Sequence, residues 1–268
     1  MGAKIYQNKK YIAFFLIPAF VFMLIFLYYP FIQNIINSFQ HIKYMGTAAD
    51  KWNAPFYKNY LEIFKDPKML IALKNTGIMI IATIVGEVGL AIVLSLLVSN
   101  IKKGAGFFRV VYFFPIVISA TALGLLFNLV FLYDKGMINQ LLQLIGVLDA
   151  GKNELIDWKA THPMFTMLVP VIWQYVGFYF IILLTGLSGI PEDLYEAAEI
   201  DGASKLQQVR YVTLPLLRNS ICTCVVLAVT GALKVFDLPW TMFVNGMSNT
   251  WLTGTYMYSK VYVDVDYS

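Results

Sequence analysis

Long apolar runs alternate with shorter polar segments along this chain of 268 residues. Each run can cross a hydrocarbon core of about 30 Å at about 1.5 Å per residue. Backbone polar groups in lipid must pair within their own segment, so the runs are predicted to be transmembrane helices. The predicted spans are residues 11–32, 76–98, 110–132, 163–187 and 216–236, and the tail from 237 to 268 contains no further span. The pattern therefore predicts an all-α polytopic membrane protein.

Composition supports the membrane class. Hydrophobic residues make up 59% of the chain and charged residues 13%, about half of the roughly 25% that soluble domains carry. A water-soluble surface is hard to build from so few charges. The net charge of +4 is small and gives no reason to expect a nucleic-acid partner.

The sequence shows no set of residues for catalysis. It lacks the G-x-x-x-x-G-K-[ST] phosphate loop, so we do not expect this chain to hydrolyse ATP. His41 and His162 lie in predicted loops without a paired nucleophile, and Cys222 and Cys224, two residues apart, do not share a helix face. We therefore predict a chain that is not an enzyme and holds no catalytic residue, metal or cofactor of its own.

Basic residues next to the spans indicate the orientation. With residues 1–10 in the cytoplasm, the inner segments would hold Lys4, Lys9, Lys10, Lys102, Lys103, Arg109, Lys205, Arg210 and Arg218. The segment between the first two spans would hold Lys43, Lys51, Lys58, Lys65, Lys68 and Lys74. The numbers are nearly even, but the inner segments are shorter and closer to the spans, which favours a cytoplasmic N-terminus and an extracellular loop at 33–69.

One polar segment between two spans has the pattern of a helical hairpin. It contains EAAEIDGASKLQQVRYVTLPLL, residues 196–217. Pro191 suits the first position of a helix, Gly202 suits a left-handed turn, and Ser204 can cap a second helix over 205–211. Pro215 then precedes the next span. The small residues Ala197 and Ala198 would let another surface approach closely.

The pattern alone leaves two interpretations of this hairpin open. It could be an amphipathic linker at the membrane interface, or a docking element for another protein. An interfacial anchor usually has more Lys, Arg and Trp on its polar face than this segment has.

The hairpin resembles the EAA loop of permease subunits in binding-protein-dependent ABC importers. The matching positions are Glu196, Ala197, Ala198, Asp201, Gly202, Leu214 and Pro215. The stretches GLSGIPEDLY before it, GALKVFDLPW after it and GAGFFRVVYFFPIVIS at 104–119 are similar to the carbohydrate branch, of the maltose and multiple-sugar type. The resemblance covers about residues 70–268 and the first span.

The resemblance implies the type I ABC importer transmembrane fold, with a core over 70–268 and a cytoplasmic coupling loop at 189–215. It implies that this loop docks in a cleft of a cytoplasmic ATPase subunit, and that the importer has two such ATPase subunits, which carry ATP and Mg²⁺. It also implies a second homologous permease subunit, an extracellular solute-binding protein, a sugar substrate and a multi-pass location in the bacterial inner membrane. Members of this type normally end with a sixth span, and this chain stops at VYVDVDYS, where that span would begin.

Polar and aromatic residues inside the spans are candidates for a substrate path, because polar groups are costly in lipid. The candidates are Asn128, Val171, Gln174, Tyr175, Phe178 and Lys234. The resemblance implies that 171–178 matches a sugar-lining stretch by position only. Ordinary helix packing remains an alternative for them, and packing or transport are both open for Glu87.

Other classes of function remain to be weighed. Lys234 keeps a charged or phosphorylated solute, such as glycerol phosphate, as an alternative cargo. An ion-coupled secondary transporter would normally show inverted repeats and more spans. An intramembrane enzyme would need a convergent catalytic set, which we do not find.

Overall fold

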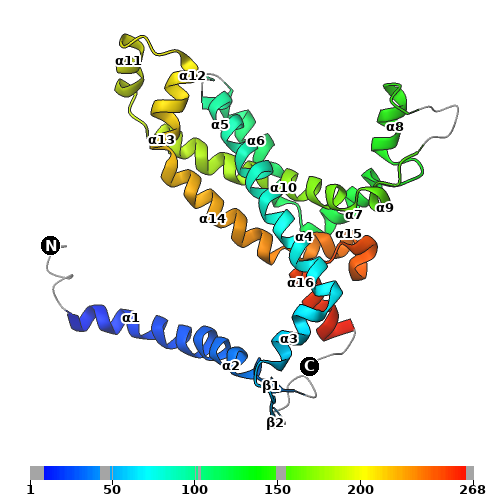
Figure 1. The fold of residues 1–268 in the computed structure, drawn as a ribbon. Helices are drawn as coiled ribbons and strands as arrows, with labels where there is room; N and C mark the ends of the chain where they lie inside the picture. The colour runs from blue at the N-terminus through cyan, green and yellow to red at the C-terminus, as the bar shows by residue number, and fades with distance from the viewer. Residues whose placement is uncertain are drawn as a thin grey trace. The chain divides into compact units, whose positions relative to one another are not determined.

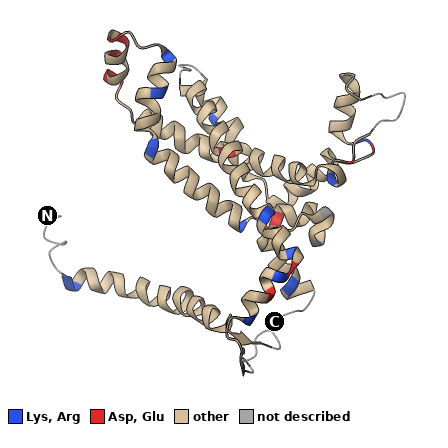
Figure 2. Ribbon diagram, in the orientation of Figure 1, with Lys and Arg blue, Asp and Glu red and all other residues tan. Residues whose placement is uncertain are grey.

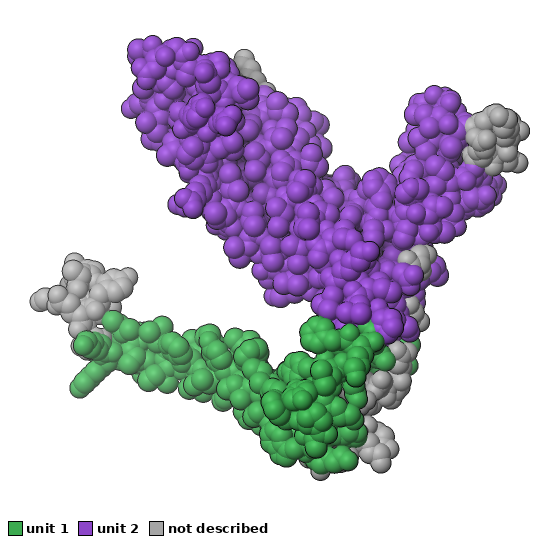
Figure 3. Space-filling view, in the orientation of Figure 1, with its two compact units in different colours: residues 1–66, 260–268 green, residues 67–259 purple. Residues whose placement is uncertain are grey.

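The computed structural model describes residues 9–42, 49, 51–99, 101, 104–148 and 155–263. These residues are mainly helical, which confirms the predicted fold class. The chain forms two compact units, Met1–Asp66 with Lys260–Ser268 and Pro67–Ser259 (Figure 3). The lysines at 4, 43, 102 and 103, which were used for the predicted orientation, lie outside the described residues.

The first unit begins with a long apolar helix. The segments α1 (Lys9–Met23), η2 (Leu24–Tyr28) and α2 (Tyr29–Asn37) follow one another without a break (Figure 1). They contain the predicted first span. No residue of these three segments is buried, and a helix that is apolar on all sides without a protein core around it is typical of a membrane span.

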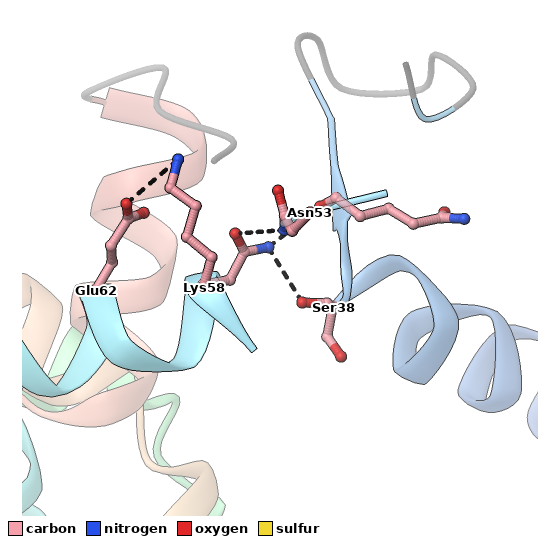
Figure 4. Close-up of polar contacts among 6 residues, drawn as sticks. Ser38, Asn53, Lys58 and Glu62 are labelled. Atoms are coloured by element: carbon pink, nitrogen blue, oxygen red, sulfur yellow. Dashed lines mark hydrogen bonds and ion pairs between the residues drawn. The ribbon is translucent and has the colours of Figure 1, made fainter. Parts of the chain in front are cut away.

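The predicted loop at 33–69 contains short regular elements. These are the antiparallel strands β1 (Gln40–His41) and β2 (Lys51–Trp52), and the helix α3 (Lys58–Lys65). Asn59 joins them: its amide donates to the carbonyls of Ser38 and Gln40, both at 3.1 Å, and accepts from Asn53 at 2.8 Å (Figure 4). The predicted loop thus contains elements too short to show a hydrophobic pattern, joined by one half-buried amide. Its extracellular location stays a prediction.

The second unit is a bundle of long helices. Its elements are α4 (Pro67–Thr83), η3 (Ile84–Gly89), α5 (Leu90–Ser99), α6 (Ala105–Phe113), η4 (Phe114–Val117), α7 (Ala120–Val130), α8 (Met137–Leu144), α9 (Trp158–Thr161), α10 (Pro163–Ser188), α11 (Asp193–Ile200), α12 (Lys205–Gln208), η6 (Val209–Thr213), α13 (Leu214–Leu216), α14 (Arg218–Lys234), α15 (Asp237–Met242), η7 (Val244–Asn249) and α16 (Thr253–Tyr258), followed by η8 (Ser259–Val263). Helix α10 packs against α5, α6, η3 and η4, while α14 packs against α4 and η3. Helix α10 is therefore the centre of the bundle.

Two apolar cores lie along α10. One surrounds its first half and includes Met79, Leu123, Met167 and Leu238. The other surrounds its second half and includes Val88, Phe180, Leu183 and Cys224. Together they fix the positions of α4, α5 and α14 around α10.

Small residues let these helices approach closely. A Cβ at Gly177 on α10 would overlap the carbonyl oxygen of Tyr112 on α6. A Cβ at Gly186, further along α10, would lie 2.6 Å from the hydroxyl oxygen of Ser220 on α14. Close backbone contact through small residues is the usual means of helix association in membranes.

The prediction that residues 110–132 form a single helix was wrong. The structure bends by 96° between the segments 105–117 and 120–130. Pro115 lies at the start of η4, Ile118 is extended, and the Ser119 hydroxyl caps α7 by accepting from the Ala122 N–H at 3.3 Å. Among the described residues, four helical segments are long and apolar enough to cross a membrane, and the bent pair makes a fifth if it counts as one span.

Two further predicted boundaries differ from the structure. The second long helix begins at Pro67 rather than near Thr76, because its first turns pack Ala72 against Trp251 and Tyr256. The tail after 236, for which no span was predicted, contains helical segments: its described residues form α15, η7, α16 and η8. All of these are short, which explains why no span was predicted there.

Candidate functional site

The polar hairpin is a helix, a turn and a helix, as predicted. It lies at the end of the second unit where α10 ends and α14 begins (Figure 1). Gly202 has φ +79°, and its N–H donates to the Glu199 carbonyl at 3.0 Å, while the Ala203 N–H donates to the Ala198 carbonyl at 2.9 Å. This pair of bonds closes α11 with a Schellman motif, in which the residue after the helix takes the left-handed conformation.

Side-chain hydrogen bonds join the two arms of the hairpin. Ser204 and Gln207 form a capping box at the start of α12, with the Ser204 N–H donating to the Gln207 side chain at 2.7 Å. The Tyr195 hydroxyl on α11 and the Thr213 hydroxyl on η6 are 3.1 Å apart. The hairpin is therefore held as one rigid element.

The predicted ends of both hairpin helices were wrong by a few residues. Helix α11 begins at Asp193, two residues after Pro191, which lies outside it. The second helix does not stop near Tyr211 but continues through Pro215 to Leu216. A π-helical turn, η6, precedes Pro215 and changes the hydrogen-bond register there, which accommodates the missing N–H of the proline.

The hairpin presents an exposed surface at its tip. Of the residues that the resemblance implies for coupling, Glu196, Ala197, Asp201, Gly202 and Pro215 are exposed, and Ala198 and Leu214 are half-buried. Sequence reasoning missed two apolar residues that flank the turn: Ile200 is 87% exposed and Leu206 is 78% exposed. They could have been found from the sequence, because they are aliphatic residues on the two sides of a turn in an otherwise polar segment.

Charged residues are sparse along the long helices and gather at this hairpin and at other helix ends (Figure 2). On the hairpin, Lys205 lies 3.9 Å from Glu199, and both side chains are largely exposed. Such a pair contributes little to stability. These charges are therefore free to contact another surface.

A cavity of about 310 Å³ lies inside the second unit, between α10, α14 and η3. Helix α10 contributes a stripe of five residues at helical spacing: Val171, Gln174, Tyr175, Phe178 and Tyr179. Three ionisable side chains also line it: Glu87 on η3, Lys234 at the end of α14 and Asp237 at the start of α15. Aromatic faces, hydroxyls and an amide are the groups that bind an uncharged polar ligand.

The structure brings together five of the six residues predicted for the substrate path. Val171, Gln174, Tyr175, Phe178 and Lys234 line the cavity. Their role in transport stays a prediction. Sequence reasoning missed Tyr179, which lies one turn after Tyr175 on the same stripe and could have been found from that spacing.

Asn128 is not among the residues that line the cavity. Its amide donates to the Thr241 carbonyl at 3.3 Å and accepts from the Lys159 ammonium at 2.9 Å. Burial lowers the pKa of Lys159, and the charge of Asp157 opposes this shift. Asn128 therefore connects α7 with α9 and α15, which is a packing role.

Gln174 has a structural partner as well as a place in the cavity wall. Its amide donates to the Ile118 carbonyl at 3.2 Å. Ile118 lies at the bend between η4 and α7, where the proline and the extended backbone leave helical carbonyls without their usual partners. Gln174 satisfies one of these, so its amide stabilises the bend.

The hairpin, the helix bundle and the cavity can be compared with known proteins. Residues 88–260 match the family described as "Binding-protein-dependent transport system inner membrane component". The chain belongs to this family. It is 33% identical over 259 residues to the "Probable ABC transporter permease protein YurN" of Bacillus subtilis, covering 96% of this chain and 87% of that protein.

Two further comparisons concern sugars. The "Arabinooligosaccharides transport system permease protein AraP" of Halalkalibacterium halodurans is 32% identical over 247 residues, covering 90% of this chain and 74% of that protein. The crystal structure of a bacterial alginate ABC transporter, in complex with an alginate pentasaccharide-bound periplasmic protein, matches with a TM-score of 0.78 at 21% identity. That match covers 96% of this chain and 85% of the solved chain, and it shows the fold.

These findings confirm the resemblance that the EAA positions indicated. Members of this family are permeases, the membrane subunits of transport systems, and not enzymes. The type I importer fold is confirmed by the match to the alginate transporter. The roles of single residues in coupling and in the substrate path are not tested by the comparisons and stay predictions.

Proposed function

We propose that this permease forms the translocation path for a sugar or oligosaccharide in an ABC importer, driven by ATP hydrolysis on separate subunits. The observation that carries the proposal is the rigid, exposed hairpin at one end of the helix bundle, in a chain of this family. A hairpin with its own capping box and an apolar tip is more than a linker between spans. It is suited to transmit motion from a partner into α10 and α14, the helices it joins.

The hairpin would dock on an ATPase subunit in the cytoplasm. The ATPases, two per importer, would bind ATP with Mg²⁺, and this chain would hold no cofactor. Ile200 and Leu206 would enter an apolar cleft, and Glu196 and Asp201 would contact polar groups at its rim. The N-terminus is then cytoplasmic, since four crossings separate it from the hairpin when the bent pair counts as one span.

The cargo would be a sugar that reaches the path from an extracellular solute-binding protein. A second homologous permease would complete the path, in the inner membrane of a bacterium. AraP supports a sugar cargo, because it is a relative over most of both chains. The alternative of a charged solute such as glycerol phosphate would call for several cations near the path, and the cavity offers Lys234 together with two carboxylates.

The docking proposal predicts a specific loss of partner binding. We expect Ile200→Asp and Leu206→Asp to reduce co-purification of the ATPase subunit about tenfold, since each places a charge in an apolar contact. The measurement is affinity purification of the tagged permease in detergent, after co-expression with its transport partners. The second permease should still co-purify.

Leu144 on α8 offers a matched control, because it is 82% exposed and lies outside the hairpin. Leu144→Asp should leave the ATPase bound. Equal co-purification of the ATPase with Ile200→Asp and with the unmodified chain would contradict the docking proposal.

The cavity predicts a role for Tyr175 in uptake. Its ring can stack on a sugar face, and a stacked aromatic ring contributes about 0.5–1.5 kcal/mol beyond its buried area. We expect Tyr175→Ala to lower sugar uptake about five- to tenfold and Tyr175→Phe, which keeps the ring, to lower it less than twofold. Uptake of a panel of labelled oligosaccharides measures this. Normal uptake with Tyr175→Ala across the panel would remove this residue from the path.

A further inference from the structure

One acidic residue of the cavity wall is buried in the middle of a span. Glu87 is only 2% exposed, lies in the middle of a membrane span, and its side chain lines the cavity. A carboxylate buried in a span is costly, and such residues usually face a cavity or a partner.

The carboxyl group of Glu87 can accept more hydrogen bonds than it makes within the described residues. The Tyr179 hydroxyl on α10 is hydrogen-bonded to it. Within the described parts of the chain no ion pair includes Glu87, although Lys234 lines the same cavity. A carboxylate offers about four acceptor sites, and the tyrosine occupies one of them. The free acceptor sites are available to a ligand in the cavity.

The backbone around Glu87 departs from regular α-helix. Glu87 lies in the π-helical segment Ile84–Gly89, and such segments inside longer helices occur frequently at functional sites. The preceding residue, Gly86, lets α10 approach: a Cβ there would lie 2.6 Å from the Cδ1 atom of Ile172. The π-helical turn and this close contact bring Glu87 and Tyr179 to one wall of the cavity.

We propose that Glu87 and Tyr179 form a subsite for the hydroxyl groups of an uncharged sugar, which rests on the function proposed above. The Glu87 oxygen sites that Tyr179 does not occupy hydrogen-bond to sugar hydroxyls. Tyr179 orients the carboxylate and adds a ring edge to the wall. Among the described residues, the ionisable side chains that line the cavity are two carboxyl groups and one ammonium, so a single cation faces the ligand. The subsite therefore favours neutral sugars over uronic acids and sugar phosphates.

The test uses the complete importer, reconstituted in proteoliposomes with its binding protein, and labelled maltose, lactose, raffinose and arabinobiose as probes. For the probe that the unmodified importer takes up best, we expect Glu87→Gln, which replaces one acceptor oxygen with an NH₂ donor, and Glu87→Ala to lower the maximal uptake rate about tenfold or more. Tyr179→Phe should lower it about threefold. The KM for the loaded binding protein should not change, because the subsite acts after the sugar has left that protein.

A buried hydroxyl elsewhere in the same span provides the control. Ser95 on α5 is fully buried, donates to the Ile92 carbonyl at 2.9 Å and is not among the residues that line the cavity. Ser95→Ala should leave uptake within twofold of the unmodified importer. ATP hydrolysis without sugar should be the same in all variants.

Three results would overturn the inference. Normal uptake with Glu87→Gln, alone or together with failure of Glu87→Ala to assemble, would mean that Glu87 serves helix packing. A uniform fall in uptake and in sugar-free ATP hydrolysis with Glu87→Gln would also mean a structural role. If the unmodified importer takes up none of the four sugars, the proposed function fails, and the subsite fails with it.

Discussion

Replacing Gly202 with valine is expected to abolish most sugar-dependent ATP hydrolysis while the permease still inserts and folds. Gly202 has φ +79°, and the left-handed conformation costs an ordinary residue about 1–2 kcal/mol, more when it is β-branched. No atom lies within 4 Å of a Cβ built there, so the strain is in the backbone alone. The turn would open and Ile200 and Leu206 would lose their relative positions.

Two variants at Gly202 distinguish an effect of the turn geometry from a loss of folding. Gly202→Asn should keep much more activity than Gly202→Val, because asparagine tolerates the left-handed conformation. Sugar-stimulated ATP hydrolysis by the reconstituted importer gives the comparison, and gel filtration of the detergent-purified permease reports folding. Equal stimulation by Gly202→Val and the unmodified chain would show that the turn geometry is not needed for coupling.

Replacing Gly177 with alanine is expected to prevent the bundle from assembling. The added Cβ would overlap the backbone carbonyl oxygen of Tyr112. A backbone oxygen cannot rotate away as a side chain can, so α6 and α10 must separate. Overpacking costs about 1–3 kcal/mol and occasionally more. We expect a cost at the upper end of this range, because α10 also packs against α5, η3 and η4 and cannot shift freely.

Gly77 on α4 is the matched control for Gly177. No atom lies within 4 Å of a Cβ built at Gly77, and alanine is favoured over glycine in a helix by about 1 kcal/mol. Gly77→Ala should therefore give the normal monodisperse peak in detergent, while Gly177→Ala should lose most of it. A normal peak and normal melting temperature for Gly177→Ala would mean that α6 and α10 do not cross as described.

The long helices and the hairpin could be predicted from the sequence because each has a repeating or local signal. Apolar length indicates a span, and the Gly202 turn and the Ser204 cap indicate where hairpin helices end and begin. These signals identified α10 within one residue of its end. They failed at 105–130, where Pro115 and a serine cap outweigh the apolar pattern, and at α3, which has only eight residues.

The cavity could be predicted only in part. The stripe on α10 follows from helical spacing, which placed Gln174 and Phe178 on one face. Glu87, Lys234 and Asp237 reach the same cavity from other helices, and no local pattern shows which helices are neighbours. Asn128 shows the same limit, because a polar residue in a span can equally satisfy a carbonyl on another helix.

The most direct test of the central claim is sugar uptake by proteoliposomes that contain the purified complex of this permease with its partners. With the binding protein and a labelled oligosaccharide outside and ATP with Mg²⁺ inside, the account predicts accumulation that stops when ATP is replaced by ADP and when Gly202 is replaced by valine. Accumulation that persists without ATP and follows an imposed ion gradient would contradict it.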